Sequence, residues 1–318
     1  MMNKKPMIVL TGPTAVGKTA LSIGLAKRIN GSIISADSMQ IYKHMDIGSA
    51  KITKEEMCGV KHYLVDELEP YEEFNIYRFK EMALEALKEI YAEGKIPIIV
   101  GGTGFYIQGL LYDIDFSETN ADEAYRNEME NYAKENGAHA LHELLREVDP
   151  ESCELIHENN VKRVIRALEY HHLTGEKISE HNKKEKEKKS PYNFAYFVLN
   201  DIRENLYSRI DLRVDKMVEA GLLEEVCTLK DMGYTPDMVA MQGLGYKEIL
   251  WYLDNRCTLN EAIETIKQET RHFAKRQLTW FRREKEVIWI DKDKFEYDDN
   301  QILDFICSTL EEKRIINC

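Results

Sequence analysis

Residues 7–19 have the sequence MIVLTGPTAVGKT, and this stretch decides the fold. Residues 7–11 form a short apolar run of the kind that makes a buried strand in a parallel sheet. The next eight residues match the pattern GxxxxGKT, and leucine or isoleucine then recurs at positions 21, 25 and 29 with helical spacing. A strand, a glycine-rich loop and a helix in this order form a P-loop, whose backbone amides and helix N-terminus bind phosphate oxygens. The stretch therefore predicts a phosphate or diphosphate site at residues 12–19.

Two side chains of this loop carry further chemistry. Lys18 supplies a mobile cation for phosphate oxygens, and the Thr19 hydroxyl is of the type that binds Mg²⁺ in such sites. The motif also holds ATP in nucleotide-binding proteins, but no apolar strand ending in an aspartate stands at the usual Walker B position, which argues against an ATP-hydrolysing motor. A glycine-rich turn without a ligand is the alternative, although it would need neither the strand before it nor the helix after it.

Further segments extend the predicted sheet. Residues 32–35 form a second apolar strand that ends just before Asp37, and residues 96–100 form another that opens into the glycine-rich turn GGTG at 101–104. Apolar residues within 76–90 recur at spacings of three and four, which predicts a helix between these strands. Because the carboxyl ends of parallel strands face the ligand, Asp37 should point toward the P-loop, with a turn or capping aspartate as the alternative. The pattern predicts an α/β fold, a P-loop NTPase-like parallel sheet flanked by helices.

Composition excludes several classes of protein. The chain has 318 residues with 43% apolar and 31% charged residues, which is a globular composition. No apolar run reaches the roughly 18 residues of a membrane helix, and the N-terminus lacks a signal peptide's pattern. The six cysteines are scattered singly, which argues against a zinc site or a disulfide scaffold and favours the cytoplasm. The formal net charge of −13 would by itself disfavour a nucleic-acid partner.

The middle of the chain differs from both ends. Residues 113–160 hold far more acidic than basic residues, with leucines at helical spacing, and an apolar run at 194–199 then resumes the sheet. These shifts predict a P-loop core of residues 1–112 and 191–318 and a helical insertion domain of residues 113–190. The lysine-rich stretch KKEKEKK at 183–189 is expected to be mostly a solvated segment.

Basic residues gather on two predicted helices of the core. Residues 271–283, RHFAKRQLTWFRR, place basic side chains on one side of a helix and aromatic ones on the other, and residues 267–285 hold seven basic against two acidic residues. A local basic stripe of this kind suits an RNA partner even in an acidic chain, with an ordinary exposed charged helix as the alternative. Arg209 and Arg213 lie one helical turn apart and suit a leaving diphosphate, although pairing with nearby acidic residues is also open.

The sequence resembles the bacterial tRNA dimethylallyltransferases (tRNA isopentenyltransferases) over nearly its whole length. The resemblance rests on blocks in the same order: GPTAVGKT at 12–19, ADSMQIYKHMDIGSAK at 36–51, GGTGFYIQGLL at 101–111, KRVIRALEYHHLTGE at 162–176, RIDLRVDKMVEAGLLEEV at 209–226, QGLGYKE at 242–248 and TRHFAKRQLTWFRR at 270–283. Val16 replaces a small Ser or Ala, and Ser49 replaces Thr, but neither change removes a chemical group that the reaction needs.

The resemblance implies a prenyltransferase that modifies tRNA. It would transfer a dimethylallyl group from dimethylallyl diphosphate to the exocyclic amine of the adenosine 3′-adjacent to the anticodon, releasing diphosphate. Asp37 would be the general base. The implied catalytic set is Asp37, Lys18, Thr19, Thr103 and Arg209, with Mg²⁺ held by Thr19. The implied diphosphate contacts are Gly12, Pro13, Thr14, Ala15, Val16, Gly17, Lys18 and Thr19, with one or more of Arg203, Arg209 and Arg213.

The anticodon stem-loop of tRNA is the implied partner, and its adenine would have to leave the base stack to reach the site. The implied RNA contacts are Asp37, Ser38, Met39, Gln40, Thr103, Arg126, Lys162, Arg163, Val164, Ile165, Arg166, Gln242, Gly243, Leu244, Gly245, Tyr246, Lys247, Lys275, Arg276, Gln277, Leu278, Thr279, Trp280, Phe281 and Arg282. A cytoplasmic monomer without membrane contact is the expected state.

Three rivals remain open at this point. A small-molecule kinase would share the P-loop and the sheet, and a prenyltransferase of free adenine nucleotides would share the chemistry, but neither needs the basic helix at 271–283. A non-catalytic RNA-binding protein would need neither Asp37 nor an intact P-loop.

Overall fold

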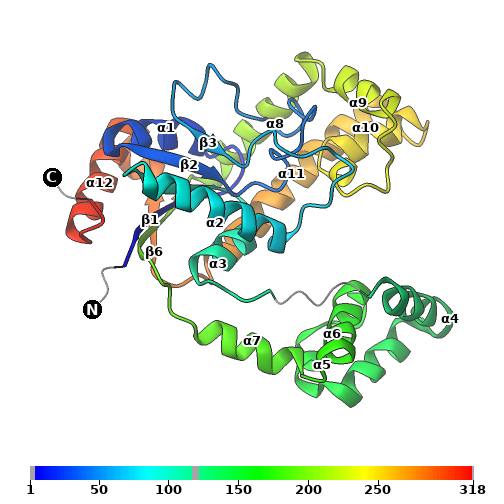
Figure 1. Ribbon diagram of the computed structural model, residues 1–318. Helices are drawn as coiled ribbons and strands as arrows, with labels where there is room; N and C mark the ends of the chain where they lie inside the picture. The colour runs from blue at the N-terminus through cyan, green and yellow to red at the C-terminus, as the bar shows by residue number, and fades with distance from the viewer. Residues whose placement is uncertain (1–3, 117–121, 317–318) are drawn as a thin grey trace. The chain divides into compact units, whose positions relative to one another are not determined.

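The computed structural model describes residues 4–116 and 122–316. The chain forms two compact units, Met1–Leu111 with Pro191–Cys318 and, separately, Tyr112–Ser190 (Figure 1). Each unit has its own hydrophobic core.

The first unit is built on a six-stranded sheet in which every hydrogen-bonded pair of strands is parallel. The strand order is β3-β2-β4-β1-β5-β6. The strands are β1 (Pro6–Thr11), β2 (Gly31–Ser35), β3 (His62–Tyr63), β4 (Ile96–Gly101), β5 (Asn193–Asn200) and β6 (Val287–Asp291). The predicted α/β fold with a parallel sheet is confirmed, while the two edge strands β3 and β6 were not among the predicted strands.

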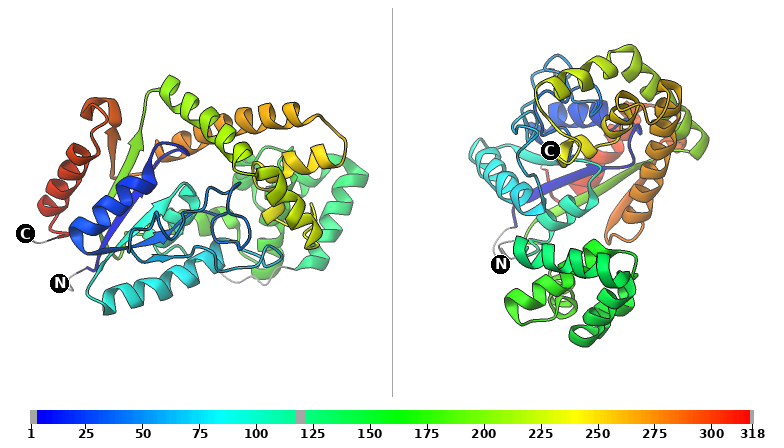
Figure 2. Two further views of the ribbon diagram at one scale, coloured as in Figure 1. Left: turned by 90° about the horizontal axis from the view of Figure 1, so that it is seen from above. Right: turned by 90° about the vertical axis from the view of Figure 1, so that its right-hand side faces the viewer.

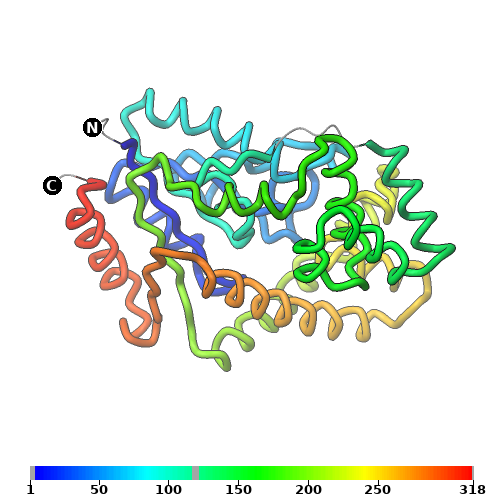
Figure 3. The backbone as a smooth tube through the Cα atoms, turned by 90° about the horizontal axis from the view of Figure 1, so that it is seen from below, coloured from blue at the N-terminus to red at the C-terminus, as the bar shows by residue number. Residues whose placement is uncertain are grey.

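Helices pack against this sheet and against one another (Figure 2). They are α1 (Lys18–Ile29), α2 (Ile76–Ala92), α3 (Gly104–Leu111), α8 (Arg203–Glu219), α9 (Leu222–Asp231), α10 (Tyr246–Leu253), α11 (Leu259–Phe281) and α12 (Asp299–Glu312), with short 3₁₀ segments at Ala240–Gln242 and Lys292–Phe295. Local sequence sets their starts: the Asn75 side chain accepts a hydrogen bond from the Arg78 amide at α2, and Thr258 and Glu261 form a capping box at α11. Helix α11 runs beside α8 and α10 (Figure 3).

The second unit is helical. It contains α4 (Glu123–Val148), α5 (Pro150–Leu155), α6 (Val161–Thr174) and α7 (Ile178–Glu187). Leu141 and Leu145 of α4 pack with Val164 and Leu168 of α6 in its core. The buried Asp149 carboxylate accepts hydrogen bonds from the backbone and hydroxyl of both Ser152 and Ser179, which joins α5 to α7.

The parallel sheet determines where the polar residues of the first unit gather. The carboxyl ends of β1, β2, β4, β5 and β6 lead respectively into the P-loop, Asp37, the GGTG turn, Asp201 and Lys292. Parallel strands end at the same edge, which is the edge where open α/β sheets generally bind ligands. Among the described residues, no helix is both long enough and apolar enough to cross a membrane.

Candidate active site

Two glycines give the P-loop its shape. Gly12 and Gly17 have φ angles of 149° and 100°, and a Cβ at Gly12 would lie 2.5 Å from the carbonyl oxygen of Leu199 in β5. Gly17 is the N-cap of α1, and among the described residues no side chain caps this helix and no acidic residue stands in its first turn. The amides at the start of α1 are therefore available to an anion.

Lys18 lies over the loop. Its ammonium donates hydrogen bonds to the carbonyl oxygens of Gly12, at 3.0 Å, and Pro13, at 2.8 Å. Burial and the positive charge of Arg213 lower the pKa of Lys18 to about 8, while the Asp37 carboxylate acts in the opposite direction. Burial also lowers the pKa of Arg213, and Asp37 again opposes this shift. The three charged groups are thus close enough to influence one another.

Asp37 is held at the end of β2 by its neighbours. Its Oδ1 accepts a hydrogen bond from the Met39 amide at 2.9 Å, and no other group in the described chain donates to its carboxylate. The Ala36 amide donates to the Val100 carbonyl, and the Thr103 amide donates to the Ala36 carbonyl, at 2.7 and 3.2 Å. This backbone pairing places Asp37 and Thr103 at adjacent strand ends. Because only Oδ1 of Asp37 accepts a hydrogen bond in the described chain, its other carboxylate oxygen is available to a substrate.

Gln277 of α11 joins the two glycine-rich turns. Its Oε1 accepts a hydrogen bond from the Thr14 amide at 2.8 Å, and its Nε2 donates to the Gly102 carbonyl at 3.1 Å. A Cβ at Gly102 would collide with the Gln277 amide, which explains the glycine there. Gln277 is therefore a structural link between the P-loop and the GGTG turn.

Arg209 is the second arginine of α8 that reaches the P-loop. It pairs with the buried Asp201 at 3.1 Å, and its Nη2 lies 3.9 Å from where a Cβ at Gly17 would stand. Arg203 behaves differently, since its guanidinium lies over the ring of Tyr207 at 5.0 Å and no described contact links it to the P-loop. The structure thus brings Arg209 near Gly17 and Arg213 near Lys18 of the P-loop, whereas Arg203 has no described contact with it.

The rest of the loop is divided between core and solvent. Val16 is fully buried in the core, Ala15 has a positive φ of 63°, and Thr19 is exposed at the start of α1. The Thr19 hydroxyl forms no hydrogen bond with the described residues, so it is available to a ligand or a metal ion.

The sequence profile described as IPP transferase matches residues 40–284. The chain belongs to the IPP transferase family. A protein of Lachnoclostridium phytofermentans named tRNA dimethylallyltransferase is 60% identical over 312 residues, which cover 98% of this chain and 99% of that protein.

Two solved structures of related transferases are similar to this chain in sequence and in fold. The full-length tRNA isopentenylpyrophosphate transferase of Bacillus halodurans is 45% identical, with a TM-score of 0.74 over 98% of each chain. A eukaryotic dimethylallyltransferase described as acting on tRNA is 32% identical, with a TM-score of 0.79 over 90% of this chain and 74% of that one.

Two segments expected to contact RNA in this IPP transferase lie side by side. A Cβ at Gly243 would collide with the Met39 side chain, so residues 242–247 pack against residues 37–40. Tyr246 is fully buried, and its hydroxyl accepts from the Ser49 amide at 3.1 Å and donates to Glu225 at 2.8 Å. Tyr246 therefore ties residues 242–247 to Ser49 and Glu225, and its side chain is not on the surface where an RNA contact was expected.

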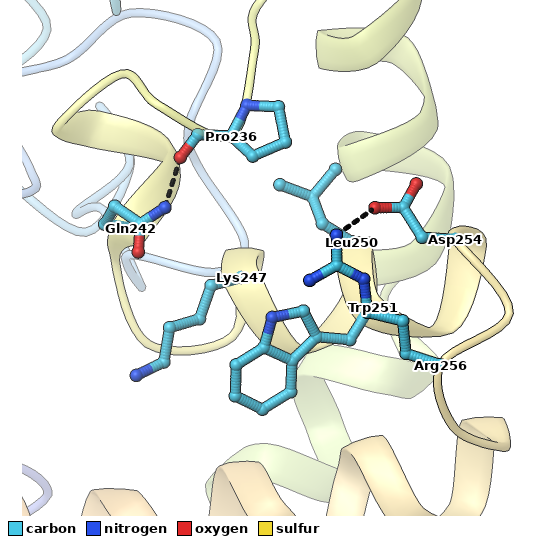
Figure 4. A pocket seen from close by; sticks show the side chains of 7 residues that line it. All are labelled: Pro236, Gln242, Lys247, Leu250, Trp251, Asp254 and Arg256. Atoms are coloured by element: carbon cyan, nitrogen blue, oxygen red, sulfur yellow. Dashed lines mark hydrogen bonds and ion pairs between the residues drawn. The ribbon is translucent and has the colours of Figure 1, made fainter.

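A pocket of about 250 Å³ opens beside this segment (Figure 4). Trp251 lies between Lys247 and Arg256, with the Lys247 ammonium 5.8 Å from the Trp251 ring centre, and Gln242 donates a hydrogen bond to the Pro236 carbonyl. Cations beside an exposed aromatic ring suit a nucleotide, which offers both phosphate and a flat base.

The last turns of α11 and the two residues that follow it carry a basic stripe, which we define as Lys275, Arg276, Arg282 and Arg283. All four side chains are exposed, and none of them forms an ion pair with any residue in the described ranges. Three other residues expected to contact RNA on this helix are turned inward: Phe281 is fully buried, Gln277 is 6% exposed, and Leu278 is partly buried against the core. The apolar ones face inward because the helix must bury one side against the core of the first unit.

Trp280 also differs from its predicted role. Its indole packs so closely on Gly104 that a Cβ there would collide with the ring, and it meets Phe105 edge-on at 6.2 Å. It holds the GGTG turn in place rather than standing free on the surface.

The second unit contains the remaining candidates. Arg126 and Arg166 both pair with Glu169, each at 2.8 Å, and the Glu169 side chain is fully buried. Burial alone would raise the pKa of Glu169, but the two arginines hold it below its usual range. Both arginines therefore already serve a structural ion-pair cluster within this unit.

The predicted RNA-binding segment of α6 is also partly internal. Lys162 and Arg163 are exposed, whereas Val164 and Ile165 are 0% and 4% exposed in the core of the unit. The direct RNA contacts expected of the two apolar side chains are not available on this surface, because they pack between α6 and α4.

Two residues near the site had no place in the sequence prediction. Lys292 follows β6 directly, and its ammonium lies 3.2 Å from where a Cβ at Gly17 would stand. Glu284 follows α11, accepts a hydrogen bond from Gln108, and has its pKa raised by burial to about 7. The apolar run at 287–290 was the available signal for β6, and so for Lys292 at its carboxyl end.

Proposed function

We propose that this IPP transferase family member transfers a dimethylallyl group from dimethylallyl diphosphate to the exocyclic amine of the adenosine 3′-adjacent to the anticodon of tRNA. The observation that carries the proposal is the placement of Asp37, with one free carboxylate oxygen, near Lys18 of the P-loop and Arg213 of α8. Such a site combines a proton acceptor with a binding site for a diphosphate leaving group. The names of the related proteins support the same reaction.

The P-loop would bind the diphosphate rather than ATP. Amides at the start of α1, the Lys18 ammonium and the two arginines Arg209 and Arg213 would stabilise the negative charge that develops on the leaving group. The Lys18 ammonium donates hydrogen bonds to the carbonyl oxygens of Gly12 and Pro13. When a diphosphate binds, the ammonium would donate to phosphate oxygens instead.

The residues present are compatible with Mg²⁺. The Thr19 hydroxyl is exposed and unpaired in the described chain, and Mg²⁺ often takes only one or two protein ligands when phosphate oxygens supply the rest. When bound there, the ion would neutralise charge on the diphosphate.

The chemical step is a substitution at the allylic carbon. The adenine amine forms the new C–N bond, the C–O bond to the diphosphate breaks, and the amine proton passes to the free oxygen of Asp37. Thr103, fixed at the neighbouring strand end, would help to position the amine. A positioned general base contributes roughly 10²- to 10⁴-fold to the rate.

The tRNA would lie across the described surfaces of the first unit. Its phosphates would contact the basic stripe of α11, and the loops at 37–40 and 242–247 would surround the target adenosine. Since the amine must reach Asp37 beside the P-loop, the adenine would leave its stack. In the second unit, the exposed Lys162 and Arg163 would supply phosphate contacts of their own.

The test is transfer of label from dimethylallyl diphosphate to unmodified tRNA, with AMP and ATP as parallel acceptors. We expect label in tRNA, in the anticodon loop, and loss of that label with Asp37→Asn. Label only in AMP or ATP would instead assign the chain to the nucleotide prenyltransferases. Consumption of ATP without any prenyl transfer would overturn the proposal in favour of a kinase.

A further inference from the structure

The last strand of the sheet delivers a lysine to the P-loop. β6 is parallel to β5, so its carboxyl end lies at the same edge of the sheet as the P-loop. Lys292 follows β6 directly, and its side chain is only 5% exposed, whereas that of Lys294 in the same short 3₁₀ segment is 71% exposed. A lysine side chain is rarely buried, so the groups that surround this ammonium matter.

The Lys292 ammonium stands in front of Gly17. It lies 3.2 Å from the position of a Cβ at Gly17, and the Arg209 Nη2 lies 3.9 Å from the same position. Gly17 is the N-cap of α1, whose first amides point outward without a capping side chain in the described chain. Two cations therefore converge on the positive end of a helix dipole, and although each pairs with one carboxylate, Asp201 or Asp299, the place where they meet favours an anion.

The only ion pair of Lys292 among the described residues leaves its donors unused. Asp299 Oδ1 lies 3.2 Å from the ammonium, yet this oxygen is buried and takes part in no hydrogen bond. No other acceptor in residues 4–116 or 122–316 takes a hydrogen bond from Lys292. An ammonium has three N–H donors, and leaving them unpaired in a buried place is unfavourable.

We propose that the Lys292 ammonium is a further binding group for the diphosphate, acting beside Arg209 at the start of α1. Asp299 holds the ammonium in place through its charge and leaves the N–H donors for phosphate oxygens. The inference rests on the proposed function, because it assumes that a diphosphate lies on the P-loop.

The test compares Lys292→Met with Lys294→Met. Methionine keeps an unbranched apolar stem in the buried position, so the packing is largely preserved. The affinity of the full-length protein for inorganic pyrophosphate, measured by calorimetry without tRNA, should fall about tenfold or more with Lys292→Met, as expected for the loss of a charged hydrogen bond. Lys294→Met should stay within twofold, and Lys292→Arg should retain most of the affinity.

Three outcomes separate the inference from the proposed function. Unchanged pyrophosphate affinity in a folded Lys292→Met protein would overturn the role of Lys292. Unchanged affinity in Lys18→Met as well would overturn the diphosphate site itself. If Lys292→Met fails to fold, Lys292→Arg and Asp299→Asn provide the test. A pyrophosphate affinity that falls more than tenfold with the charge-retaining arginine, together with an unchanged affinity in Asp299→Asn, would contradict direct binding by a positioned ammonium.

Discussion

The amide oxygen of Gln277 accepts a hydrogen bond from the backbone amide of Thr14, and its NH₂ group donates to the Gly102 carbonyl. A side chain from α11, far along the chain, thus fixes the P-loop and the GGTG turn relative to each other. The resemblance had placed Gln277 among the RNA contacts, whereas its burial makes it a positioning residue.

Gln277→Met should lower kcat/KM for dimethylallyl diphosphate by about 10- to 100-fold. The methionine fills the same space but leaves a buried amide and a buried carbonyl without partners, at roughly 1–3 kcal/mol for each group. The KM for tRNA should change little, which steady-state kinetics with each substrate varied in turn would show. Asn260→Ala, at an exposed position of the same helix outside the expected RNA contacts, is the matched control, and a rise in the KM for tRNA alone would favour a direct RNA contact for Gln277.

Asp37→Asn should reduce the single-turnover rate by about 100-fold or more, because the amide cannot accept the amine proton. Asparagine still accepts the hydrogen bond from the Met39 amide, so the loop should keep its shape. Affinity for pyrophosphate should hold or rise slightly, because a negative charge is removed from beside Lys18 and Arg213. Quench-flow measurement of labelled tRNA tests the rate, and turnover at the normal rate would mean that the proton goes elsewhere.

Diphosphate affinity should fall as the pH rises above about 8. The lowered pKa of Lys18 means that its ammonium is charged below about pH 8 and loses its charge above it. A cation favours phosphate binding, so affinity is greatest on the acid side of that pKa and declines by at most tenfold per pH unit on the alkaline side. Calorimetric titration with pyrophosphate between pH 6.5 and 9.5 measures this profile. The arginine of Lys18→Arg keeps its charge throughout this range. A decline in affinity near pH 8 that persists in this variant would therefore belong to another group.

Replacing Arg276 and Arg283 together by alanine should weaken tRNA binding and flatten its dependence on salt. Neither arginine has an ion-pair partner in the described chain, so their charges are available to phosphates. Each lost phosphate contact should reduce the slope of log K against log[salt] by about 0.7 to 0.9. Filter binding at several salt concentrations gives the slope, with Lys313→Ala on the exposed end of α12 as control. An unchanged slope would place the RNA away from this stripe.

Glu284→Gln should stabilise the protein at pH 8 but not at pH 4. Burial raises the pKa of Glu284 from 4.5 to about 7, so the folded state binds a proton that the unfolded state has lost. Stability therefore falls as the pH rises from about 4.5 to 7, and the full penalty, roughly 3 kcal/mol before solvent screening of this partly exposed carboxylate reduces it, is present above pH 7. Urea unfolding at both pH values measures the difference against the exposed Glu312→Gln, and equal effects at pH 4 and pH 8 would contradict the assignment.

Sequence reasoning identified the parts of the fold whose signals are local. The P-loop and the strands leading into Asp37 and the GGTG turn have short patterns that specify their own backbone. β3 has only two residues and leaves no pattern, so its place at the sheet edge depends on pairing with β2. The direction of individual side chains on α6 and α11 was also missed. A motif covers consecutive residues of a helix, but only the residues on one face of that helix are exposed to a partner. Val164, Ile165 and Phe281 face the core for this reason.

The Glu225 carboxylate occupies a backbone nest of the kind that binds anions. Its carboxylate accepts hydrogen bonds from the successive amides of Asp46, Ile47 and Gly48, at 2.8, 2.7 and 3.0 Å, in the manner of a phosphate on a backbone nest. The Tyr246 hydroxyl completes the arrangement. An internal ligand of this kind keeps these three amides from binding free phosphate, and it fixes residues 46–48 before any substrate arrives.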